Sequence, residues 1–170
     1  MEKKTALMVI DIQQGLFEKP TPIYREEEFL NNVNSLIDHA RETGIPVIFI
    51  QHSNNDSLIL NSHNWQLHPA IQPQKGEKTI YKLHGNAFEK TNLKEILDSQ
   101  GITDLVITGL VTHGCVRATT QGALKLGYKV ILVSDGHSNF SKDAKYIIKK
   151  WNQTLNKKGA ELVPTAEIVF

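Results

Sequence analysis

The stretch DLVITGLVTHGC, residues 104–115, decides the fold class. It opens on a mostly apolar run, residues 104–108, which has the length and β-branched content of a buried strand. A loop bounded by Gly109 and Gly114 then leads to Cys115, and a helical pattern over residues 115–126 stops at Gly127. A strand, a short loop and a helix in this order predict one unit of a parallel sheet, because consecutive parallel strands must be joined by a crossover.

The rest of the chain repeats this alternation of strands and helices. Strands are expected at residues 6–11, 46–51 and 129–133, with weaker candidates at 79–82 and 160–163. Helical spacing of apolar residues predicts helices over 26–43 and 92–100, and from Ser141 to near Gly159. The alternation predicts an α/β fold: a single-domain, doubly wound parallel β-sheet flanked by helices, Rossmann-like in arrangement, over residues 1–170.

Composition and charge exclude several classes of protein. The chain has 170 residues and one cysteine, and a domain of about this size buries roughly two-thirds of its unfolded surface without needing a disulfide or a metal. A lone cysteine fits a reducing compartment. The net charge of +1 offers no basic surface for nucleic acid, and no run reaches the ~20 apolar residues of a membrane span. The apolar run near the N-terminus is too short for a signal peptide, so we expect a cytoplasmic protein without nucleic-acid or membrane partners.

Two residues qualify for a crevice at the carboxyl edge of this sheet. In doubly wound sheets, ligands bind outside the carboxyl ends of strands, at the point where the strand order reverses. Asp11 ends the first expected strand, and Cys115 follows the loop after strand 104–108. A carboxylate at the end of an apolar strand is costly unless it is used, and it suits a group that accepts and returns a proton. The alternative is an aspartate that caps a turn.

Cys115 stands at the expected start of a helix, where free backbone N–H groups and the positive helix end stabilise a thiolate and so lower the pKa of a thiol. This is the position of a nucleophile, although a lone cysteine is more often a small buried hydrophobe. The spacing of Gly109 and Gly114 also fits the start of a phosphate-binding loop, but Cys115 and Val116 stand where that motif needs Lys and Ser or Thr. The loop is therefore interpreted as a site for an oxyanion.

Two further features are less specific. The segment 51–78 is long and polar and carries several histidines, which favours a functional loop over a hinge between domains. Lys82 closes the weak strand 79–82, and strand order does not place it in the crevice. Considered by itself, Lys82 is a surface lysine.

Several pieces of the chain together resemble the isochorismatase-like cysteine hydrolases, the family of nicotinamidases and N-carbamoylsarcosine amidases. They are residues 106–119 (VITGLVTHGCVRAT) with 127–130 (GYKV) and 133–135 (VSD), residues 11–13 (DIQ) with Phe17, and Lys82 six residues before Phe88, followed by 91–93 (TNL). Residues 65–69 (WQLHP) are similar to the family's central loop. The resemblance covers nearly the whole chain and implies the isochorismatase-like hydrolase fold.

The resemblance implies a catalytic triad of Asp11, Lys82 and Cys115. It also implies a cis peptide bond between Leu110 and Val111, and an oxyanion hole formed by the amides of Val111 and Cys115. A substrate pocket is expected to include Phe17, Trp65 and Thr112. The implied enzyme cleaves a C–N bond of a small amide or ureido compound through a thioester and needs no cofactor.

Differences between this sequence and particular subfamilies narrow the choice of reaction and of metal content. Nicotinamidases carry an acidic metal ligand after the second strand, and residues 51–54 (QHSN) lack it, so no metal is expected; a metal held by His52, His63 and His68 is the less favoured alternative. The presence of Cys115 favours amide chemistry over the vinyl-ether hydrolysis of true isochorismatases, in which Asp11 is the general acid. A third alternative is a catalytically inactive family member that serves as a binding subunit. The family also suggests a homo-oligomer, and the physiological substrate does not follow from the sequence.

Overall fold

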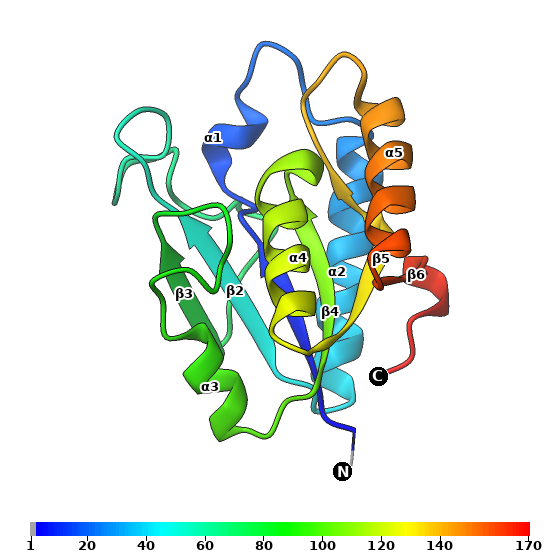
Figure 1. Ribbon diagram of the computed structural model, residues 1–170. Helices are drawn as coiled ribbons and strands as arrows, with labels where there is room; N and C mark the ends of the chain where they lie inside the picture. The colour runs from blue at the N-terminus through cyan, green and yellow to red at the C-terminus, as the bar shows by residue number, and fades with distance from the viewer. Residues whose placement is uncertain (1–2) are drawn as a thin grey trace.

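The computed structural model describes residues 3–170 and shows a six-stranded sheet with helices on both faces (Figure 1). The strands are β1 (Thr5–Ile10), β2 (Val47–His52), β3 (Lys78–Lys82), β4 (Asp104–Leu110), β5 (Lys129–Ser138) and β6 (Glu161–Val163). The helices are α1 (Gln14–Phe17), α2 (Glu26–Glu42), α3 (Leu93–Ser99), α4 (Arg117–Lys125) and α5 (Ala144–Lys157). Every strand pairing is parallel, which confirms the predicted doubly wound α/β sheet.

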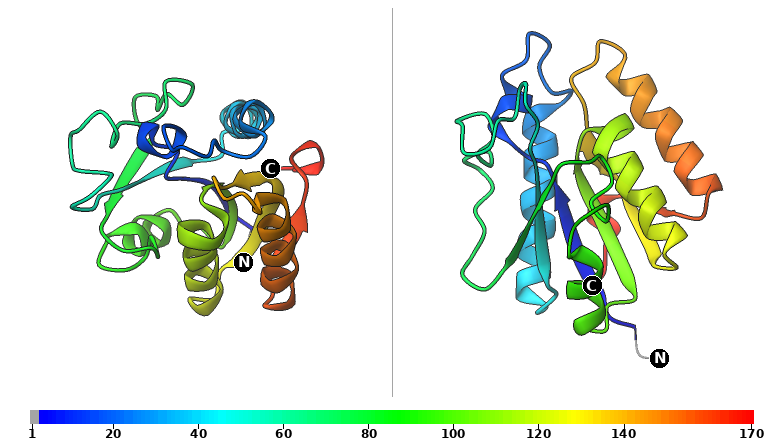
Figure 2. Two further views of the ribbon diagram at one scale, coloured as in Figure 1. Left: turned by 90° about the horizontal axis from the view of Figure 1, so that it is seen from above. Right: turned by 60° about the vertical axis from the view of Figure 1, so that its left-hand side comes forward.

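Two apolar layers hold the helices against the sheet. α2 covers one face, and α3, α4 and α5 cover the other, as the view from above shows (Figure 2). Alternate residues of β1 serve the two layers: Leu7 and Val9 pack on the α2 side, and Met8 and Ile10 on the side of α3 to α5. Because full burial of such a side chain contributes about 1.5–3 kcal/mol, packing rather than helix propensity fixes the helices in place.

The strand order β3-β2-β1-β4-β5-β6 reverses between β1 and β4. These two strands are neighbours, and Ile10 pairs with Gly109 at their carboxyl ends. Gly109 has a φ of 129°, and a Cβ at this position would overlap the carbonyl oxygen of Ile10, so only glycine allows this close approach. The segments that leave β1 and β4 therefore begin side by side, as the topology predicted for Asp11 and the loop of Cys115.

β5 is longer than the sequence pattern predicts. The expected strand ended at Val133, whereas β5 continues to Ser138 and, after a register shift in β4, pairs His137 with Gly109. Polar residues interrupt the apolar run after Val133, and this hid the extension. β6 pairs with β5 only up to Val133, so no strand within residues 3–170 covers the outer edge of the extension.

The other boundaries differ from expectation in small ways. The helix expected at residues 115–126 begins with a wide turn, Thr112–Val116, and becomes regular at Arg117. Ser141 was expected to cap the last helix; its hydroxyl accepts a hydrogen bond from the amide of Asp143 in a turn that precedes α5. The four-residue helix α1 was too short to leave a periodic pattern. Among residues 3–170, no helix combines the length and the apolar character needed to cross a membrane.

Candidate active site

Asp11 lies directly after β1, at the point where the strand order reverses. Its backbone takes a left-handed conformation with a φ of 49°, and its side chain is buried. The carboxylate oxygen Oδ2 lies 3.0 Å from Nζ of Lys82. The other oxygen, Oδ1, is buried and has no hydrogen-bond partner among residues 3–170. The carboxyl group thus has one oxygen that is available to accept a proton.

Lys82 is buried, with 1% of its surface exposed, so the interpretation of an ordinary surface lysine is wrong. It ends β3, and β2 separates β3 from β1, yet its long side chain passes the end of β2 and reaches Asp11. The Nζ atom has four close neighbours: Asp11 Oδ2 at 3.0 Å, His52 Nδ1 at 3.0 Å, His84 O at 3.1 Å and Cys115 Sγ at 3.1 Å. An ammonium has only three protons for these four neighbours. The sulfur is the weakest acceptor among them, so it shares an ammonium proton with one of the other three acceptors.

Cys115 lies in the turn Thr112–Val116 with its sulfur on Lys82. Burial, and after it the charge of Asp11, raise the pKa of the Cys115 thiol to about 12, against the opposing effect of Lys82. The prediction that the helix start lowers the pKa of this thiol is therefore wrong for the resting site, because burial and the carboxylate outweigh it. The resting thiol is neutral, and a base must take its proton before or during attack.

The side chains that surround the ammonium also form a potential set of metal ligands. One ligand atom each of Asp11, His52 and Cys115 lie within 4.8 Å of one another. The Lys82 ammonium is in contact with all three, so the cation of this cluster is the lysine itself. His63 contacts Glu18 at 2.7 Å, and the ring of His68 packs on Phe17 at 4.4 Å, so the structure does not gather the loop histidines around His52.

The loop before Cys115 has the expected backbone. The peptide bond between Leu110 and Val111 is cis, which confirms that prediction. The carbonyl of Val111 accepts hydrogen bonds from the amides of Gly114 at 3.0 Å and Val116 at 3.4 Å, so the turn closes around this carbonyl. The oxyanion hole at the amides of Val111 and Cys115 stays a prediction.

Each of the three residues expected in a substrate pocket contacts a different neighbour. The ring of Phe17 packs on His68. The ring of Trp65 packs on Tyr81, 5.6 Å between centroids, and Tyr81 and Lys82 are consecutive in β3, so their side chains point to opposite faces of the sheet. Thr112 is buried, and its hydroxyl contacts His137 at 2.9 Å. The pocket also stays a prediction.

Gln13, for which the sequence pattern predicted no role of its own, holds the long loop beside the site. Its amide nitrogen donates to the carbonyls of His52 (2.9 Å) and Trp65 (2.8 Å), and its amide oxygen accepts from the backbone N–H of His52 (2.8 Å). The side chain is fully buried. A polar residue two positions after Asp11, at the end of an apolar strand, was the available signal.

Comparison with known proteins agrees with this geometry. The model of the isochorismatase domain matches residues 5–167 of the chain. The chain belongs to the isochorismatase family. It is thus an isochorismatase-family hydrolase. The structure brings Asp11, Lys82 and Cys115 into contact, and their role as a catalytic triad stays a prediction.

Three similar proteins illustrate the range of this family. A streptothricin hydrolase from Streptomyces noursei is 29% identical over 137 residues, which are 79% of this chain and 50% of that protein. Nicotinamidase 3 from Arabidopsis thaliana is 27% identical over 157 residues, 82% of this chain and 76% of that protein. The crystal structure of an isochorismatase from Pseudomonas putida KT2440 has a TM-score of 0.90 and 28% identity, and the match covers 99% of this chain and 92% of that one. This chain therefore spans only half the length of the streptothricin hydrolase.

Proposed function

We propose that this isochorismatase-family protein is a cysteine hydrolase that cleaves the C–N bond of a small amide or ureido compound through a thioester on Cys115. In this proposal Asp11 carries the proton and Lys82 stabilises the negative charges. The supporting observation is that one buried ammonium lies 3.0 Å from a carboxylate oxygen and 3.1 Å from the sulfur of the chain's single cysteine. A base, a cation and a nucleophile in mutual contact are the components of covalent hydrolysis.

The first step forms the bond between Sγ and the carbonyl carbon of the substrate. Asp11 accepts the thiol proton, and its unpartnered Oδ1 is the oxygen available for it. Because the pKa of the Cys115 thiol is raised to about 12, Asp11 has to take the thiol proton before or during attack. The amides of Val111 and Cys115 would stabilise the oxyanion, and each such donor typically contributes about 2.7–4 kcal/mol.

The remaining steps return every group to its starting state. The C–N bond breaks, and Asp11 gives its proton to the departing nitrogen, which leaves as ammonia or an amine. Asp11 then takes a proton from water as the water oxygen attacks the thioester carbon. The C–S bond breaks, the acid product leaves, and the proton on Asp11 returns to the Cys115 sulfur.

His52 supports the position of the ammonium in this scheme. Burial and the charge of Lys82 lower the pKa of the His52 ring, so the ring is neutral near pH 7. A neutral ring accepts a hydrogen bond from Lys82 at Nδ1, 3.0 Å away, and carries its own proton on Nε2. Lys82 is therefore held by three fixed acceptors, the third being the carbonyl of His84, while it remains in contact with the sulfur.

A panel of small primary amides and ureido compounds, assayed for ammonia release, tests the proposal. Nicotinamidase 3, whose name denotes hydrolysis of an amide, supports the choice of panel. The expected result is ammonia release, together with an acyl adduct on Cys115 in the mass of acid-quenched protein. Turnover of vinyl ethers alone would favour the isochorismatase reaction, and an unreactive protein that binds these compounds would favour a binding subunit.

A further inference from the structure

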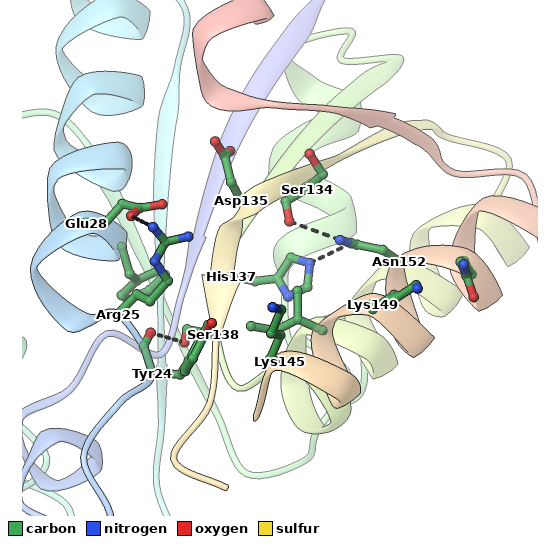
Figure 3. A pocket seen from close by; sticks show the side chains of 13 residues that line it. Tyr24, Arg25, Glu28, Ser134, Asp135, His137, Ser138, Lys145, Lys149 and Asn152 are labelled. Atoms are coloured by element: carbon green, nitrogen blue, oxygen red, sulfur yellow. Dashed lines mark hydrogen bonds and ion pairs between the residues drawn. The ribbon is translucent and has the colours of Figure 1, made fainter. Parts of the chain in front are cut away.

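A chain of hydrogen bonds, buried at its inner end and part-buried at its outer end, adjoins the nucleophile turn and has no part in the proposed chemistry. It starts at the hydroxyl of Thr112, which lies 2.9 Å from His137 Nδ1. His137 Nε2 lies 2.8 Å from Asn152 Oδ1, and Asn152 Nδ2 lies 3.0 Å from the carbonyl oxygen of Ser134. Figure 3 shows the outer part of this chain, in which Asn152 of α5 lies between Ser134 and His137 of β5.

The direction of each bond follows from one fixed end. The carbonyl of Ser134 can only accept, so Asn152 presents its NH₂ group to Ser134 and its oxygen to His137. His137 must then carry a proton on Nε2, which leaves Nδ1 as an acceptor. The Thr112 hydroxyl is therefore the donor to His137, and its oxygen accepts from Asn139 Nδ2 at 3.4 Å. Thr112 has no proton left for a substrate.

These hydrogen bonds can all form only while His137 is neutral, since a protonated ring has no acceptor nitrogen for the Thr112 hydroxyl. The ring is 3% exposed, and burial lowers the pKa of His137 to about 4. Asp135 acts in the opposite direction. Other charged groups line a cavity of about 370 Å³ against which His137 lies. They are Arg25, which directly precedes α2, and Glu28 of α2, which form an ion pair at 2.7 Å, together with Lys145 and Lys149 of α5.

Thr112 opens the turn that carries Cys115. The buried Thr112 side chain fixes the first residue of this turn to β5 and α5, and three residues later the sulfur meets Lys82. The carbonyl of Val111, just before Thr112, accepts two amides of the same turn. A shift at Thr112 is therefore transmitted to the sulfur, and a misplacement of about 1 Å costs about a hundredfold in rate.

We propose that His137 is a positioning residue for the nucleophile: in its neutral form it accepts the hydroxyl proton of Thr112 and thereby holds the turn that aims Cys115. This inference rests on the proposed function, because the effect on rate requires that Cys115 does the chemistry. It assigns Thr112 a role in holding the turn and not in binding substrate. The two roles differ in the kinetic constant that they affect.

The test replaces Thr112 by valine, which has the same shape without the hydroxyl, and by serine, which keeps it. Thr120→Val is the matched control, because Thr120 is a buried threonine of α4 whose hydroxyl has no partner among residues 3–170. On the amide found by the panel, Thr112→Val should lower kcat about tenfold to a hundredfold with KM changed less than twofold. Thr112→Ser should restore kcat to within about threefold, and Thr120→Val should match the parent.

A second variant keeps the inference testable if Thr112→Val does not fold. Asn152→Asp places a carboxylate on His137 Nε2, which raises the pKa of the ring and favours the protonated form without an acceptor. The kcat of Asn152→Asp should therefore fall on acidification and recover as the pH rises. This fall should begin at a higher pH than any fall in the kcat of the parent. A pH profile of kcat that superposes on that of the parent would overturn the neutral-acceptor role.

Two outcomes separate this inference from the proposed function. If Thr112→Val has the kcat of Thr120→Val, or raises KM at unchanged kcat, the positioning role is wrong. If Cys115→Ala turns over the same amide, the proposed function is wrong whatever the Thr112 variants do. A dead Cys115→Ala beside a fully active Thr112→Val overturns this inference alone.

Discussion

Replacing Asp11 by asparagine should make Cys115 more reactive and the enzyme inactive. Burial and Asp11 together raise the pKa of the Cys115 thiol to about 12, and Lys82 opposes them. Asparagine keeps the shape of Asp11 but carries no charge. The substitution therefore removes the effect of Asp11 that raises the pKa of the thiol, and it leaves the effect of Lys82 that lowers this pKa. A charge in contact typically moves a pKa by about 1–3 units, so the pKa of the thiol should fall by that amount.

The expected gain in alkylation rate follows from this fall. A thiol whose pKa is one unit lower supplies ten times more thiolate at pH 7, but each thiolate is a weaker nucleophile, and with a Brønsted slope of about 0.4–0.5 the net gain is about three- to fourfold. A fall of about 1–3 units therefore predicts a rate of iodoacetamide alkylation about 3 to 60 times that of the parent. Amide turnover should nevertheless be lost, because no group remains to move protons.

The assay is the rate of mass increase of the intact protein with iodoacetamide at pH 7, which reports Cys115 alone because the chain has one cysteine. Asp104→Asn is the matched control: Asp104 is a buried aspartate at the opposite, amino end of the sheet, in β4. Circular dichroism checks the fold, since breaking a buried ion pair typically costs about 3–5 kcal/mol. Alkylation of Asp11→Asn that is slower than or equal to that of the parent would refute the reasoning.

The remaining predictions concern Lys82 and His137. Lys82→Met should raise the pKa of the Cys115 thiol further and slow alkylation, whereas Lys78→Met, on an exposed lysine of the same strand, should not; equal rates would remove Lys82 from the site. Acidification from pH 7 to 4 should cost the native state up to about 3 kcal/mol at His137, because its ring has a pKa of about 4 when folded and 6.5 when unfolded, so only the unfolded chain binds that proton in this interval. In urea titrations the unfolding free energy of His137→Gln should therefore fall less over this interval than that of the parent, and parallel falls would contradict the assignment.

Asp11 and Cys115 were predictable from the sequence because their position depends on strand ends and on the reversal of strand order. Both are topological properties that apolar runs and short links reveal. Gly109 was expected to begin the loop, whereas it lies within β4, where the close approach of β4 to β1 requires a glycine. For Asp11 and Cys115, local pattern and tertiary structure carry the same information.

Lys82 and His137 show what a local pattern does not contain. Lys82 reaches Asp11 past the end of β2, a path that depends on the packing of three strands, and only the family resemblance suggested it. His137 lies in the polar extension of β5, where the apolar run has already ended, and its partner Asn152 comes from α5. The direction of the pKa shift at Cys115 was also beyond reach, because it depends on burial and on the distance to a carboxylate.

Turnover by Cys115→Ala is the most direct test of the central claim, that the sulfur of Cys115 forms the bond to the substrate. The substitution removes one sulfur from a half-buried turn, so the variant should fold as the parent does. With the best amide of the panel, the expected result is a folded protein that binds the compound and releases no ammonia above background. Ammonia release near the rate of the parent would show that Cys115 is a bystander and that the reaction does not pass through a thioester.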